Sequence, residues 1–141
     1  MIRPRWERAD DAARDPARAT MRDVFARVLY GYALLTHLMV LAGSPWPPVG
    51  VEAALSFVTL LGGAAACVMM LRLPRARWEA RRQIAFVLGV YGFVRLGLLG
   101  TALRAPERDD TLLIALAIGG SIWVALMAAA VLVYADLPSS R

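Results

Sequence analysis

Three ionisable residues lie within or at the start of apolar stretches of this sequence, and they are the best candidates for chemistry. His37 and Arg95 are each embedded in an apolar run, and Glu52 begins another. Even the lowest scales give a cost of about 2.5–3.5 kcal/mol for an arginine at the middle of a membrane. Arg95 must therefore face other protein groups, pair with an acid or extend toward lipid headgroups. Glu52 is the acid best placed to pair with it.

Small polar and aromatic side chains accompany these residues at helical spacing. Ser56 and Thr59 continue the face of Glu52 at intervals of four and three residues, and Tyr91 lies one turn before Arg95. On helices, such side chains would line a shared polar crevice. Two interpretations stay open. Arg95 and Glu52 form a structural ion pair, or the group binds a solute, an ion or a lipid headgroup.

Signatures of catalysis are absent from the sequence. It contains no HExxH motif, no GxSxG motif, no glycine-rich phosphate loop and no pair of carboxylates within an apolar run. Cys67 is the only cysteine and His37 the only histidine, so the chain offers neither an intrachain disulfide nor a metal-ligand cluster. We therefore expect no enzymatic activity, no cofactor and no metal.

Four long apolar runs carry the candidate residues. The chain is 59% hydrophobic with a mean hydropathy of +0.54, whereas soluble domains are about 45–50% apolar. A helix of about 20 apolar residues crosses the hydrocarbon layer of a bilayer. The sequence therefore predicts an all-α integral membrane protein with four transmembrane helices in a bundle, over about residues 24–42, 51–71, 83–103 and 111–137.

A polar, arginine-rich tail, residues 1–23, precedes this transmembrane domain of residues 24–137, and a short tail of residues 138–141 follows it. The dipeptide Asp15-Pro16 predicts a helix start, because aspartate can cap free amides and proline fits the first turn. We expect a short amphipathic helix at the membrane surface that leads directly into the first span.

The arginines predict the orientation of the spans. All sixteen basic residues are arginine; thirteen lie in the N-terminal tail up to Arg27, the 72–82 segment and the C-terminal tail, and only Arg104 and Arg108 lie in the opposite loops. Positive residues concentrate on the cytoplasmic side. We therefore expect a multi-pass protein of the bacterial cytoplasmic (inner) membrane with both termini in the cytoplasm. Because the arginines flank helices, we expect no nucleic-acid binding.

Small residues at regular spacing predict close helix contacts. In lipid, such residues mark the places where helix backbones approach one another. The fourth span carries a ridge at four-residue spacing, and the second and third spans carry glycines: Ala117, Ser121, Ala125 and Ala129, with Gly63 and Gly89. These faces pack within the bundle, or one ridge is left for a partner subunit.

For function, the sequence favours a non-enzymatic accessory, assembly or oligomer-forming subunit that acts through helix contacts. We expect it in the lipid bilayer as a homo-oligomer or as part of a larger membrane complex. The alternative is a small oligomeric transporter or channel that uses the crevice around Arg95, Glu52 and His37. A holin-like membrane effector is a further alternative.

The predicted orientation can be checked by cysteine accessibility. Positions 44–48 and 105–109 should be labelled only from outside, and positions 76–80 only from inside, because short arginine-rich loops stay in the cytoplasm. Labelling of position 78 from the periplasm would overturn the whole arrangement.

Overall fold

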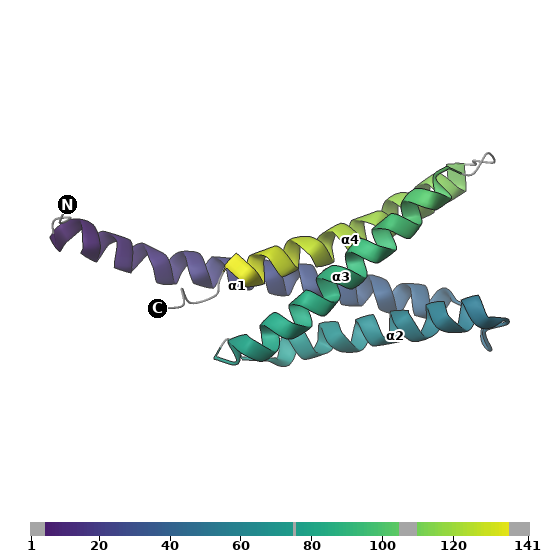
Figure 1. Ribbon diagram of the computed structural model, residues 1–141, viewed down its shortest axis with the longest axis horizontal. Helices are drawn as coiled ribbons and strands as arrows, with labels where there is room; N and C mark the ends of the chain where they lie inside the picture. Colours follow the sequence, from purple (N-terminus) through teal and green to yellow (C-terminus); the bar gives the residue numbers. More distant parts are fainter. Residues whose placement is uncertain (1–4, 75, 105–109, 136–141) are drawn as a thin grey trace.

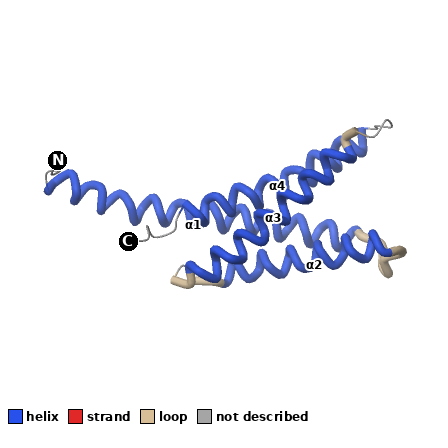
Figure 2. Tube along the Cα trace, viewed as in Figure 1, coloured by secondary structure: helices blue, strands red, loops and turns tan. Residues whose placement is uncertain are grey.

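The computed structural model describes residues 5–74, 76–104 and 110–135. These residues form four helices joined by loops (Figure 2). Each helix contains a segment long and apolar enough to cross a membrane, as the sequence predicts. The helices are α1 Arg5–Gly43, α2 Val51–Arg72, α3 Trp78–Ala102 and α4 Asp110–Ala135.

Helix α1 is one continuous helix that covers both the predicted surface helix and the predicted first span. It begins at Arg5, so the predicted start at Asp15-Pro16 is wrong, and no break separates residues 23 and 24. Alanine and arginine, which favour helix, are frequent before Pro16. They can offset the one backbone hydrogen bond that a proline cannot donate. Figure 1 shows the first part of α1 (purple) extending past the other helices.

The helices form two antiparallel hairpins, α1–α2 and α3–α4. Helix α4 packs along both α1 and α3, whereas α2 and α3 touch over a shorter stretch. We call the end at which each hairpin turns the tip; it holds Gly43, Val51, Ala102 and Asp110. The opposite end, which holds Ala135, is the base. Figure 1 shows the hairpins diverging toward the tip.

The ridge predicted on the fourth span is divided between the interior and the surface. Ala125 and Ala129 are buried in the bundle, and Ala117 and Ser121 are exposed. The Ser121 hydroxyl lies 2.6 Å from the hydroxyl of Tyr32 on α1. Two of the four ridge residues are therefore buried within the chain, and the exposed half stays open to the second alternative, contact with a partner subunit.

A carboxylate at the base joins α1 to α3. Asp23 accepts a hydrogen bond from Arg27 Nε at 3.0 Å and a second from Arg81 Nη2. The Arg81 side chain is only 6% exposed and that of Asp23 16%. Because unpaired buried charges are costly, Asp23 holds the start of α3 against α1.

Two arginines of α1 also bind the C-terminal ends of the other helices. Arg27 donates to the carbonyl oxygens of Leu71 at 2.7 Å and Leu73 at 3.2 Å, where α2 ends. Arg22 donates to the carbonyl of Ala135 at the end of α4, at 2.8 Å. The last carbonyls of a helix lack helical partners and carry partial negative charge, so arginines suit them. A six-residue segment of α1, residues 22–27, thus ties all three other helices at the base.

The Asp23 carboxylate can be tested by mutation. Asp23→Asn should lower the free energy of unfolding by about 3 kcal/mol, the low end for breaking a buried ion pair, because Arg81 keeps its charge and loses its counter-ion. Glu79→Gln is the matched control, since Glu79 is exposed and forms no ion pair with a described residue. Thermal unfolding in one detergent measures both. Equal stability of the two variants would contradict the role of Asp23.

Candidate functional site

Side chains from α1, α3 and α4 meet against a glycine of α2 inside the bundle. The His37 ring on α1 is fully buried and lies edge-on to Trp123 of α4, with ring centroids 5.5 Å apart. Tyr91 of α3 lies edge-on to Trp123 at 5.3 Å. A Cβ atom added to Gly63 of α2 would lie 2.9 Å from both His37 Nε2 and Tyr91 Cε1. Only a glycine at position 63 lets these rings meet without a shift.

The hydrogen bonds of His37 fix which ring nitrogen carries a proton. Nδ1 lies 2.6 Å from the carbonyl oxygen of Ala33, one turn earlier on α1. A carbonyl can only accept, so Nδ1 donates. In the neutral ring Nε2 is then an acceptor, and the Tyr91 hydroxyl donates to it across 3.3 Å. His37 is thus held by both of its nitrogens, as a residue that positions Tyr91.

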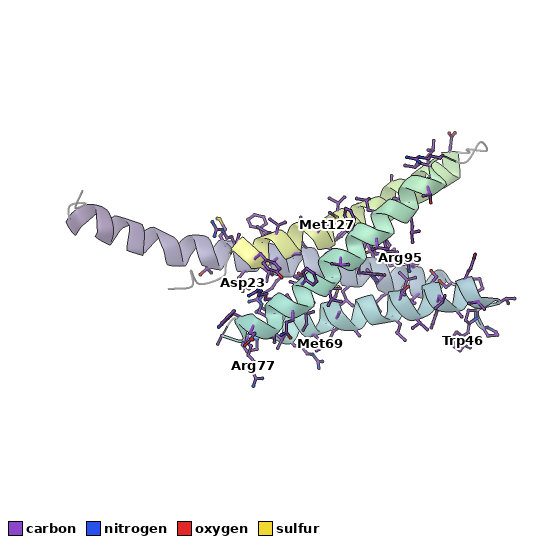
Figure 3. The ribbon with its side chains drawn as sticks, viewed as in Figure 1. Asp23, Trp46, Met69, Arg77, Arg95 and Met127 are labelled. Atoms are coloured by element: carbon purple, nitrogen blue, oxygen red, sulfur yellow. The ribbon has the colours of Figure 1, made fainter. Side chains whose placement is uncertain are left out.

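Arg95 lies one turn from Tyr91 toward the tip, and its guanidinium contacts neutral groups. The guanidinium carbon is 5.6 Å from the ring centroid of Tyr91 and 5.6 Å from that of Trp123. On the α2 side, Nη2 donates to the Thr59 hydroxyl and lies 3.5 Å from the Ser56 carbonyl oxygen. Figure 3 shows Arg95 between Asp23 at the base and Trp46 at the tip. We call these five residues the Arg95 cluster: Tyr91, Arg95, Trp123, Thr59 and Ser56.

The predicted pair of Arg95 with Glu52 is not formed. Among the described residues, Arg95 has no ion pair, and neither has Glu52, which is exposed. Glu52 lies one turn before Ser56 on α2, nearer the tip. The Arg95 side chain therefore meets α2 one to two turns below the carboxylate. This is a correction to the ion-pair interpretation.

The Arg95 cluster has the features of an anion site. Arg95 is only partly buried and Thr59 is exposed, so both can be reached from outside the protein. A guanidinium presents several N–H donors in a plane that fits a carboxylate or a phosphate. The threonine hydroxyl adds a donor or an acceptor beside it. In contrast, no group of three histidine, cysteine or acidic residues that would suit a metal occurs in the described part of the chain.

The structure brings five predicted site residues together and leaves one apart. His37, Tyr91, Arg95, Thr59 and Ser56 form one continuous set of contacts, whereas Glu52 lies outside it.

Three residues that organise the bundle were not among the predicted site residues: Trp123, Asp23 and Arg81. Tryptophan favours membrane interfaces, so a tryptophan well inside an apolar run was a signal for Trp123. No comparable signal separates Asp23 or Arg81 from the other charged residues around them.

Both glycines predicted for packing lie where helices approach closely, whereas three other glycines of α2 and α3 do not. Beyond Gly63, a Cβ at Gly89 would lie 3.1 Å from the Cβ of Ala130, so α3 and α4 approach closely there. A Cβ at Gly62, Gly97 or Gly100 would meet nothing within 4 Å. Helix contact therefore accounts for the first two glycines and not for the last three.

Comparison with protein-family models, with curated proteins and with solved structures found no match. The case for a function rests on the geometry of the chain itself.

Adjacent glycines of α2 give a matched test of the site. Gly63→Ala should destabilise the protein by about 1–3 kcal/mol, the usual cost of overpacking, because the buried His37 ring cannot move away. Gly62→Ala should leave stability unchanged or raise it by up to about 1 kcal/mol, since alanine favours helix and its Cβ meets nothing. Thermal unfolding in one detergent compares them. Equal effects would show that the rings do not meet at Gly63.

Proposed function

We propose that this protein is a small, non-enzymatic, multi-pass membrane protein that binds an anionic group at the Arg95 cluster. The observation that carries the proposal is the guanidinium of Arg95, which contacts only neutral described groups. A charged side chain within a membrane span is rare and marks a functional site by default.

The contacts of Arg95 offset only part of the cost of its position. Arg95 lies seven residues before the end of α3, or about 10 Å along the helix. The two aromatic faces contribute about 0.5–1 kcal/mol each at a partly exposed site. The remaining contacts are hydrogen bonds to neutral oxygens, which leave the positive charge in place. A bound anion would supply the missing counter-charge.

The alternative of a small transporter or channel uses the same residues. It would move an anion past Arg95 instead of holding it. With the arginine-rich base in the cytoplasm, the tip would face the opposite side of the membrane, and the ligand would enter from there. Binding at Arg95 is common to both versions.

A second function, an accessory or oligomer-forming subunit, is favoured by a different observation. Ala117 and Ser121 are exposed on α4, and Gly97 and Gly100 of α3 have open space where a side chain would be. Small exposed residues allow close contact with another helix in lipid. This function does not depend on Arg95.

The anion proposal can be tested with purified, delipidated protein in a maltoside detergent. At constant ionic strength, inorganic phosphate or phosphatidylglycerol should raise the unfolding temperature of the wild type, because a ligand that binds only the folded state stabilises it. Arg95→Gln should abolish the rise while the variant stays folded. Arg77→Gln removes an exposed arginine near the base and should respond like the wild type.

Two outcomes would contradict anion binding at Arg95. One is a wild type that responds to neither probe. The other is an Arg95→Gln variant that responds as strongly as the wild type. If Arg95→Gln also leaves the oligomeric state in detergent unchanged, the subunit function is supported instead.

A further inference from the structure

Two opposite charges lie in order along one side of α2, and they match the headgroup of a particular class of lipid. We propose that the Arg95 cluster and Glu52 together bind a zwitterionic phospholipid of the ethanolamine type. Arg95 and Thr59 would hold the phosphate, and Glu52 would hold the ammonium. This inference rests on the proposed function and adds the identity of the ligand and a role for Glu52.

The order of the charges follows from the stripe on α2. Glu52, Ser56 and Thr59 fall on one face at intervals of four and three residues. The Arg95 guanidinium contacts this stripe at Ser56 and Thr59. Along α2, Glu52 lies about 6 Å nearer the tip than Ser56 and about 10 Å nearer the tip than Thr59. The cation is therefore deeper in the span, and the carboxylate is nearer its end.

A phospholipid of the ethanolamine type carries its charges in the complementary order. Its phosphate is attached to the glycerol and lies nearer the acyl chains, and its ammonium follows after an ethylene bridge, toward water. A phosphate at Arg95 and Thr59 would thus place the ammonium toward Glu52. Neither charge of the headgroup would be left without a partner.

Glu52 also makes a simple anion a weaker ligand than a zwitterionic one. It is exposed and forms no ion pair with a described residue, so its carboxylate faces whatever approaches along the stripe. A carboxylate one to two turns from the guanidinium repels a free phosphate or an anionic lipid. It attracts a ligand that carries a positive charge beyond its phosphate. A primary ammonium can also donate hydrogen bonds to a carboxylate, which a quaternary choline cannot.

The surroundings of the site fit a lipid in preference to a water-soluble compound. Exposed apolar side chains lie on the base side of Thr59 and Arg95, where the acyl chains would extend: Leu61 of α2 is 53% exposed and Val90 of α3 is 46% exposed. At the tip, Trp46 lies against Phe57 with ring centroids 5.2 Å apart and is itself exposed. Tryptophan is typical of the headgroup level of a membrane.

A competition experiment tests the inference. The full chain in detergent is incubated with equal amounts of phosphatidylethanolamine and phosphatidylglycerol of the same acyl chains, and native mass spectrometry counts the bound lipids. The wild type should prefer phosphatidylethanolamine by about fivefold, which corresponds to about 1 kcal/mol for a partly exposed ion pair. Glu52→Gln should abolish or reverse the preference. Glu79→Gln, at the base, should leave it unchanged.

The remaining arms separate this inference from the proposed function. Arg95→Gln should lose both lipids, because both bind through a phosphate. If Arg95→Gln does so while Glu52→Gln keeps the wild-type preference, the ethanolamine assignment is wrong and anion binding stands. A wild type that prefers phosphatidylglycerol would also overturn the assignment. Free phosphoethanolamine should compete weakly; full displacement of lipid by it would identify a soluble ligand instead.

Discussion

The bundle depends on a single carboxylate at its base. Asp23 bridges Arg27 of its own helix and Arg81 of α3. Apolar contacts alone give weak specificity between helices in lipid, because lipid tails offer the same contacts. A buried ion pair has one geometry, so it fixes which face of α3 meets α1. Together with the arginine contacts to the ends of α2 and α4, it joins four helices at residues 22–27 of α1.

The hairpins are joined at the base and separate toward the tip, and the Arg95 cluster lies where they separate. Toward the tip the hairpins diverge, and α2 meets α3 only over a short stretch (Figure 1). The rings of His37, Tyr91 and Trp123 pack against one another in the interior. Arg95 follows directly, where α2 still offers Thr59 but no longer encloses the guanidinium. The same divergence leaves the cation partly exposed, as the proposed ligand site requires.

Helical spacing predicted which residues form the site but not which of them contact one another across helices. Four apolar runs predicted four helices, and spacing within α2 and α3 put Thr59 on the stripe of Glu52 and Tyr91 one turn before Arg95. Spacing within a helix does not fix how far one helix is shifted or rotated against the next. Arg95 therefore meets Thr59 in place of Glu52. For the same reason the sequence did not distinguish buried Arg81 from its exposed neighbours.

The arginines at the two levels of the bundle differ in how their charge is compensated. At the base, two arginines share the Asp23 carboxylate, and the remaining positive charge lies against the carbonyls that end α2. A helix C-terminus carries about half a negative charge, so this level is close to neutral. Arg95 has only a hydroxyl, two aromatic faces and a carbonyl of Ser56, which lies within α2 where no helix end adds its dipole. The uncompensated charge of the described interior is thus concentrated at Arg95. The proposed phosphate ligand would compensate the charge at that level of the bundle.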